Sequence, residues 1–94
     1  MRVRWLIAAL AYVDAEVDYI TRDDPAAADR LADKIRHSVE QLVEYPAMGR
    51  AGRVPGTREL MISGTPYVVP YRVREGVVQI LRVFHAARRW PTMF

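Results

Sequence analysis

The spacing of apolar residues changes its period along the chain, and each change predicts a different element. Residues 1–5 alternate between polar and apolar, which indicates a short strand with Val3 and Trp5 on one side. From about Leu6 the apolar positions recur every three or four residues, as on one face of a helix. The residues of this predicted face are Leu10, Val13, Val17 and Ile20. The helix start is poorly marked, because Leu6 and Ile7 stand where a Ser, Thr or Asp cap is expected.

A second helix is predicted to begin at Asp24-Pro25. The Asp24 side chain can cap the free amides of the first turn, and Pro25 suits the first helical position. The apolar stripe of this helix consists of Leu31, Ile35, Val39 and Leu42. The stripe ends near Tyr45, just before Pro46. Because only residues 22–24 join the two helices, we expect an antiparallel hairpin with both apolar faces turned the same way.

Residues 46–56 are predicted to form a basic loop, since glycine and proline recur there beside two arginines. Beyond the loop the period becomes two, which predicts strands at 57–63, 67–74 and 77–85. Glu75-Gly76 is typical of a two-residue hairpin turn. That turn would set Tyr71 opposite Ile80, Val73 opposite Val78 and Arg74 opposite Val77.

The strand register assigns side chains to two sheet faces. The face expected to pack on the helices carries Tyr67, Val69, Tyr71, Val73, Val78, Ile80, Arg82 and Phe84. The other face, which would meet water or a partner, carries Val68, Pro70, Arg72, Leu81, Val83 and His85. Pro70 cannot donate to a strand ladder, so we expect a sheet edge or an irregularity there. The predicted fold is α+β, with a short N-terminal strand and an antiparallel helix hairpin on a twisted antiparallel sheet, in the order β-α-α-β-β-β.

The bulk composition is that of a small folded domain. With 94 residues, 51% hydrophobic and 27% charged, residues 1–94 should form a single domain. A net charge of +3 suits an acidic partner or a nucleic-acid surface. The chain has no cysteine, which fits a reducing compartment, and we expect it in the cytoplasm. No apolar run approaches the roughly 20 residues that span a bilayer, so no membrane association is expected.

Three segments, in order, resemble the ParE branch of the RelE/ParE toxin family. They are YPAMGRAGRVPGTREL at 45–60, GTPYVVPYRV at 64–73 and ILRVFHAARRWP at 80–91. The resemblance extends over nearly the whole chain, and three linked segments are more specific than one short motif. It implies the toxin of a type II toxin–antitoxin system, held in a hetero-oligomer by a ParD-like ribbon-helix-helix antitoxin. It further implies inhibition of DNA gyrase, with no bond broken by the toxin itself.

Two alternatives stay open at this point. The first is a RelE-like, ribosome-dependent mRNA endoribonuclease, in which His85 would act with Arg58 and Arg72. In that ribonuclease branch a tyrosine follows the histidine, whereas this chain has Ala86, and the catalytic arginine after the last strand has no clear counterpart. These departures favour a role for His85 as a strand-end residue with local hydrogen bonds. The second alternative is a non-toxic member that only binds its antitoxin and regulates their operon.

The arginines are the main candidates for binding. We expect the antitoxin on the second sheet face and near the basic loop, at Arg50, Arg53, Arg58, Val68, Pro70 and Arg72. The charged and aromatic tail residues Arg88, Arg89 and Trp90 are the candidates for contact with the target. Two widely spaced histidines without cysteine make no metal site, so neither a metal nor a cofactor is expected.

Overall fold

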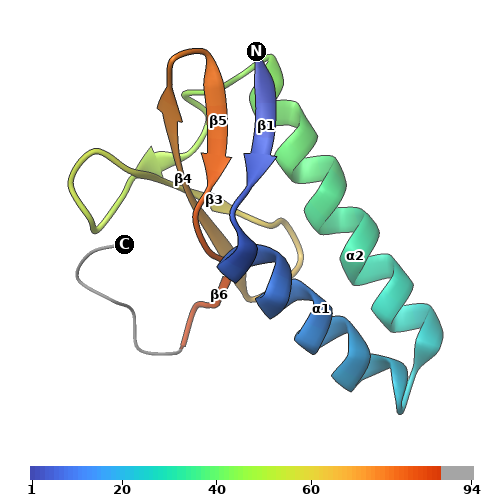
Figure 1. The fold of residues 1–94 in the computed structure, drawn as a ribbon. Coiled ribbons are helices and arrows are strands. Elements are labelled where there is room, and N and C mark those ends of the chain that lie inside the picture. Colours follow the sequence, from blue (N-terminus) through green and yellow to red (C-terminus); the bar gives the residue numbers. More distant parts are fainter. Residues whose placement is uncertain (88–94) are drawn as a thin grey trace.

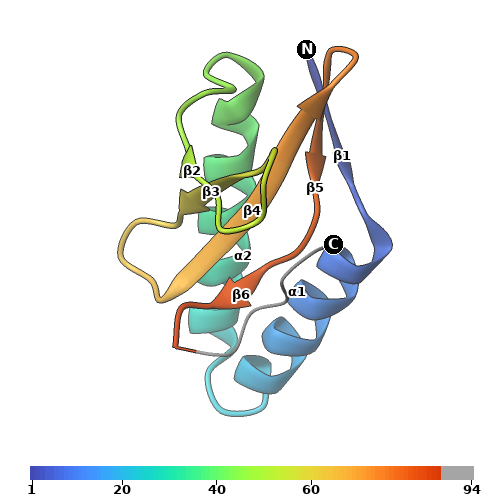
Figure 2. The ribbon, with the colours of Figure 1, turned by 90° about the vertical axis from the view of Figure 1, so that its left-hand side faces the viewer.

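Both helices lie on the same side of one sheet, as an antiparallel hairpin (Figures 1 and 2). The computed structural model describes residues 1–87 of the 94-residue chain. Helix α1 spans Ile7–Thr21 and helix α2 spans Pro25–Glu40, which continues into a short 3-10 helix, η1, at Gln41–Val43. The helix hairpin predicted from the apolar spacing is therefore confirmed. Within residues 1–87, neither helix combines the length and apolar character that a membrane crossing requires.

Helix α2 begins and packs as its sequence predicts. The Asp24 side chain accepts a hydrogen bond from the Ala27 amide at 3.0 Å, and Pro25 takes the first helical position. The predicted stripe is confirmed, because all of its members are buried in the core: Leu31, Ile35, Val39 and Leu42. This helix therefore supplies the helical half of the core.

Helix α1 begins without a side-chain cap, and the residue before it is bonded to the sheet. The Leu6 amide donates to the Ile80 carbonyl at 3.0 Å, which fixes the chain as it enters the helix. Ala9 is fully buried, and Val13 and Ile20 pack on the core. Leu10 is 45% exposed, so its predicted place on the buried face is wrong. The buried face instead includes Ala9.

The sheet is mixed, with the strand order β1-β5-β4-β3-β2 and β6 beside β4. The strands are β1 Arg2–Trp5, β2 Arg50–Ala51, β3 Arg58–Met61, β4 Tyr67–Arg74, β5 Val77–Ile80 and β6 Phe84–His85. Strand β4 pairs antiparallel with both β3 and β5, as predicted, and β1 joins the edge of β5 in the parallel sense. The predicted loop at 46–56 also contains the two-residue strand β2, which pairs with β3.

The hairpin between β4 and β5 forms in the predicted register. Tyr71 lies opposite Ile80 and Val73 lies opposite Val78. Glu75 and Gly76 have φ values of 50° and 74°, which is the backbone of a type I′ turn. This turn matches the twist of the flanking strands, so two residues suffice to set the register of the central pair.

The ladder between β4 and β5 breaks at Pro70. The Leu81 amide donates to the Pro70 carbonyl at 3.0 Å, but the proline has no N–H to return the bond. The Leu81 carbonyl accepts instead from Arg82 Nη1 at 2.7 Å. Strand β5 ends at Ile80, one residue before this break. The irregularity predicted at Pro70 is therefore confirmed, and it falls in a central strand.

Beyond the break, pairing resumes one residue out of step. Strand β6 sets Phe84 opposite Val68, so Arg82 and Val83 bulge against a single residue of β4. A one-residue bulge turns the following side chains to the opposite face. Val83 is accordingly buried in the core, whereas Arg82 and Phe84 are only half-buried and lie outside it. The prediction that placed Arg82 and Phe84 on the helix-packed face, and Val83 on the other, is wrong for this reason.

The helix–sheet packing makes a direct stability prediction. Leu42 is fully buried in the core, so Leu42→Ala should lower the free energy of unfolding by about 2–5 kcal/mol, because it removes transfer energy and leaves a cavity. Leu10→Ala, on the exposed part of α1, should change it by less than about 1 kcal/mol. Urea unfolding followed by circular dichroism measures both. Equal losses in the two variants would contradict the assigned buried face of α1.

Candidate functional site

The basic loop is held to the sheet by a buried carboxylate, Glu59 on β3. Its exposed fraction is 2%, and it is the one buried charged side chain among residues 1–87. Arg50 donates to Oε1 through Nη2 at 3.0 Å and Nε at 3.3 Å. The Arg53 amide donates to Oε2 at 2.8 Å, and the Arg53 guanidinium lies 3.8 Å from the same oxygen. Both carboxylate oxygens are therefore satisfied, as a buried charge requires.

A buried tyrosine holds the same loop from the core. The Tyr71 hydroxyl donates to the Pro46 carbonyl at 2.7 Å and accepts from the Gly49 amide at 2.9 Å. A Cβ at position 49 would lie 2.6 Å from Tyr71 Cε1, so only glycine allows this approach. Burial raises the pKa of Tyr71, against smaller opposing effects of the Gly49 amide and Arg58. The phenol thus stays protonated and continues to donate to the loop.

The third loop contact comes from Arg58, whose Nη1 donates to the Gly49 carbonyl at 2.9 Å and the Ala47 carbonyl at 3.4 Å. Of the four arginines predicted to bind an antitoxin, Arg50, Arg53 and Arg58 therefore bind Glu59 or their own loop. Arg50 and Arg53 remain 55% and 49% exposed, so each still offers part of its side chain to a partner. The structural role of Glu59 was not predicted from the sequence. The available signal was its position, because it is the sole acidic residue between Glu44 and Glu75 and lies close to these arginines in sequence.

A groove of about 360 Å³ lies beside the anchored loop, between helix α2 and strand β3. Its lining residues are Ser38, Gln41, Met48, Gly49, Arg50, Glu59, Leu60, Met61 and Ser63. Met48 and Met61 are 44% and 48% exposed. Strand β2 pairs with β3 only as far as Glu59, so within residues 1–87 the rest of this β3 edge has no neighbouring strand. The groove therefore combines an open backbone edge with flexible apolar side chains and a cation.

The second sheet face is less open than its sequence predicts. Val68 and Pro70 are both buried, so the chain already covers two side chains that we expected a partner to cover. Arg72 is half-buried and its Nε donates to Gln79 Oε1 at 2.7 Å. Val68, Pro70 and Arg72 are the β4 residues that we predicted to contact an antitoxin. Of these, only Arg72 has a side chain that is partly exposed.

The candidate ribonuclease residues do not converge. His85 lies opposite Tyr67 and Arg58 lies opposite Tyr71, four residues apart along β4, or roughly 13 Å. Arg72 follows Tyr71 directly, and its side chain therefore points to the opposite face of the sheet. A general acid or base must come within about 3 Å of the proton it transfers, and charge-stabilising groups must lie around the same reacting atoms. No such constellation exists among these three residues.

His85 makes local contacts at the end of β6. Its Nδ1 accepts a hydrogen bond from the Ala87 amide at 3.2 Å, and its ring meets Tyr67 edge-on with centroids 5.8 Å apart. The Tyr67 hydroxyl in turn donates to Glu16 Oε2 at 2.6 Å, which joins the strand to helix α1. The prediction of a strand-end histidine with local hydrogen bonds is confirmed.

The predicted target contacts Arg88, Arg89 and Trp90 lie outside the described residues. Across residues 1–87, no three His, Cys, Asp or Glu side chains are grouped so as to hold a metal ion. The described site is thus a basic, partly apolar surface built around Glu59 and Tyr71, with chemistry suited to binding.

Residues 3–90 match the sequence model of the family described as the ParE toxin of the type II toxin–antitoxin system parDE. A Sinorhizobium fredii protein, Y4kP, described as a candidate toxin, is 47% identical over 90 residues, covering 96% of this chain and 93% of its own. Toxin RelE2 of Caulobacter vibrioides is 41% identical over 87 residues, covering 93% of this chain and 97% of its own.

The fold also matches a solved structure, titled as a chromosomal ParDE toxin–antitoxin system from P. aeruginosa. The TM-score is 0.81 at 32% sequence identity, and the match covers 90% of this chain and 95% of that one. Sequence and fold therefore agree on one family.

The buried carboxylate makes the second prediction. Glu59→Gln should lower the free energy of unfolding by about 1.5–3 kcal/mol, because charge-assisted hydrogen bonds to Arg50 and Arg53 are lost. A matched control is Asp33→Asn, which removes an exposed ion pair with Arg36 and should cost under about 1 kcal/mol. Urea unfolding gives both values, and faster amide hydrogen exchange at Arg53 should accompany the first. Similar losses in both variants would show that Glu59 does not anchor the loop.

Proposed function

Because the chain belongs to the ParE family of toxins from type II toxin–antitoxin systems, we propose that a ParD-like antitoxin silences it and that DNA gyrase is its target. The solved relative is titled as a ParDE system, in which the toxin is named together with ParD. A ribbon-helix-helix antitoxin would hold this toxin in a hetero-oligomer until the antitoxin is removed. The free toxin would then act by binding, without breaking a bond itself.

The observation that best supports a binding mechanism is the separation of His85 from Arg58 and Arg72. Arg58 is occupied by the Ala47 and Gly49 carbonyls, and His85 Nδ1 by the Ala87 amide. A ribonuclease would need a base and cations around one phosphate, and these residues lie apart along β4 and on two faces. This arrangement favours gyrase inhibition over the cleavage of ribosome-bound mRNA.

The groove beside the loop is where we place the antitoxin. An extended segment could add a strand to the open edge of β3 beyond Glu59, with main-chain hydrogen bonds that supply affinity. Met48 and Met61 would receive its apolar side chains, because methionine adapts to irregular partners. Acidic side chains of the segment would face the exposed parts of Arg50 and Arg53.

The antitoxin proposal predicts a position-specific loss. Met61→Asp should weaken binding of a ParD-like protein encoded beside this gene by about tenfold or more, because it puts a charge where apolar contacts are expected. Leu10→Asp is the matched control, since Leu10 is similarly exposed, at 45% against 48%, but lies on α1. A calorimetric titration measures both. Loss of binding with Leu10→Asp alone would move the interface to α1, and a toxin that ignores the neighbouring protein would exclude it as the antitoxin.

The target proposal makes a prediction about gyrase and about the small contribution of His85 to its inhibition. Purified toxin should inhibit supercoiling by gyrase, or trap cleaved DNA, and leave translating mRNA intact. His85→Gln should keep most of this inhibition, because most interface residues cost under about 1 kcal/mol when truncated. Loss of a general acid–base histidine would instead cost about 10²–10⁴-fold.

Antitoxin binding serves as the folding control for this experiment. Replacing Arg88, Arg89 and Trp90 together with alanine should weaken inhibition more than His85→Gln does, because charged and aromatic side chains are better candidates for target contact. A folded His85→Gln variant without toxicity, together with ribosome-dependent mRNA cleavage by the parent chain, would move the toxin to the ribonuclease branch. A parent chain inactive in both assays would favour the non-toxic, regulatory member.

A further inference from the structure

Four arginines lie on the sheet face that the helices leave open, two on β1 and two on β4. Strand β1 sets Arg2 opposite Val77, and β4 sets Arg74 opposite the same residue, so the three form one row across the sheet. A second row is formed in the same way by Arg4, Gln79 and Arg72. We call Arg2, Arg4, Arg72 and Arg74 the arginine patch.

The spacing of the patch follows from strand geometry. Neighbouring strands lie about 4.8 Å apart, so the arginines at the two ends of a row are roughly 10 Å apart at their backbones. The rows are two residues apart, or about 7 Å. Because residues directly opposite one another, and residues two apart on a strand, share a face, all four side chains leave the sheet on the same side.

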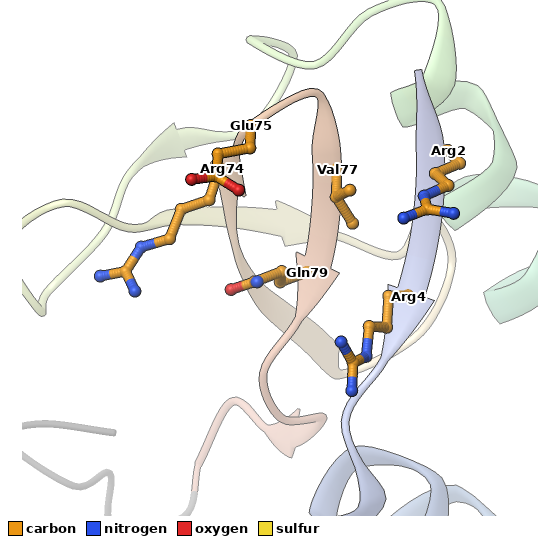
Figure 3. A pocket seen from close by; sticks show the side chains of 6 residues that line it. All are labelled: Arg2, Arg4, Arg74, Glu75, Val77 and Gln79. Carbon is orange, nitrogen blue, oxygen red and sulfur yellow. The ribbon is translucent and has the colours of Figure 1, made fainter.

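Three members of the patch, Arg2, Arg4 and Arg74, border an open depression (Figure 3). Its volume is about 560 Å³, and its lining residues are Arg2, Arg4, Arg74, Glu75, Val77 and Gln79. Within residues 1–87, Arg2, Arg4 and Arg74 form no hydrogen bond or ion pair through their guanidinium groups. Glu75 supplies the one carboxylate of the lining. Three cations thus line one depression with a single carboxylate among them.

The lining indicates what kind of ligand fits. A protein interface has an apolar core, yet Val77 is the one apolar residue here. Single-stranded nucleic acid is bound through aromatic side chains on which bases stack, and the lining has none. Guanidinium groups match phosphate oxygens with paired hydrogen bonds. An open group of arginines with neither apolar anchors nor aromatic rings therefore suits the regularly spaced phosphates of a duplex.

We propose that the arginine patch binds the phosphate backbone of double-stranded DNA directly and without sequence preference. This surface is distinct from the groove at β3 and goes beyond the proposed action on gyrase, because it requires no second protein. Gln79 holds Arg72 at the edge of the patch through the 2.7 Å bond, while the other three arginines supply the phosphate contacts. Direct contact of this kind would keep the free toxin on DNA.

The salt dependence of DNA binding tests the proposal. Fluorescence anisotropy with a labelled duplex of arbitrary sequence would follow binding of purified, antitoxin-free toxin between 50 and 200 mM salt. Three phosphate contacts correspond to a log–log slope of about −2.7, or roughly a 40-fold loss of affinity over that range. The triple variant Arg2→Gln, Arg4→Gln, Arg74→Gln should lose a slope of about this size and bind more weakly at 50 mM.

A matched triple variant separates the patch from overall charge. The control changes Arg22→Gln, Arg30→Gln and Arg36→Gln alter exposed residues of the helix hairpin, the first at the C-cap of α1 and the other two on α2. They likewise lower the formal net charge from +3 to zero. This control should keep the slope of the parent chain. Glu75→Gln should change binding in the opposite direction, with tighter binding, because it removes the carboxylate of the lining. Thermal melting confirms that each variant is folded.

Three results would overturn the proposal. The first is equal salt slopes for the patch variant and the helix variant, which would mean that only net charge matters. The second is absence of duplex binding by the parent chain at 50 mM salt. The third is a patch variant that binds duplex DNA normally but loses antitoxin affinity, which would assign the arginines to the protein partner. None of these readouts involves gyrase, so failure here leaves the target proposal intact.

Discussion

The need to satisfy one buried carboxylate organises the functional end of this protein. A buried carboxylate such as Glu59 needs hydrogen-bond donors, and Arg50 and the Arg53 amide supply them. Those bonds bring the chain back along β3, which creates the strand β2 and closes one side of the groove. Tyr71 holds the preceding turn from the core. The loop is thus part of the folded framework, although it has little secondary structure of its own.

The elements that could be predicted from sequence are those specified by local chemistry. Asp24-Pro25 starts α2, and Glu75-Gly76 forms a two-residue turn that sets the register of β4 and β5. The errors come from tertiary constraints. Pro70 ends β5 and introduces a bulge, which moves Val83 into the core after a single extra residue. Leu10 has the spacing of a buried residue, but the packing of α1 selects Ala9.

The candidate site was likewise predicted only where local sequence features specify it. The resemblance placed the chain in its family, and the loop arginines were recognised as important, but charge in a sequence does not identify a partner. Arg50 and Arg53 bind Glu59, and Arg58 binds backbone carbonyls. The arginine patch could not be inferred locally, because it forms only when β1 pairs with β5 in parallel. Periodicity identified that first strand without showing which neighbour it would choose.

The parallel pairing of β1 with β5 also determines when the sheet can be completed during synthesis. Arg2 lies opposite Val77, so the first strand stays without its partner until most of the chain has been synthesised. Contacts between such distant segments carry the largest loop-closure cost and therefore form late in folding. A nascent chain would present its helix hairpin early and its arginine patch last. Synthesis itself would then delay the appearance of that surface until strand β5 has left the ribosome.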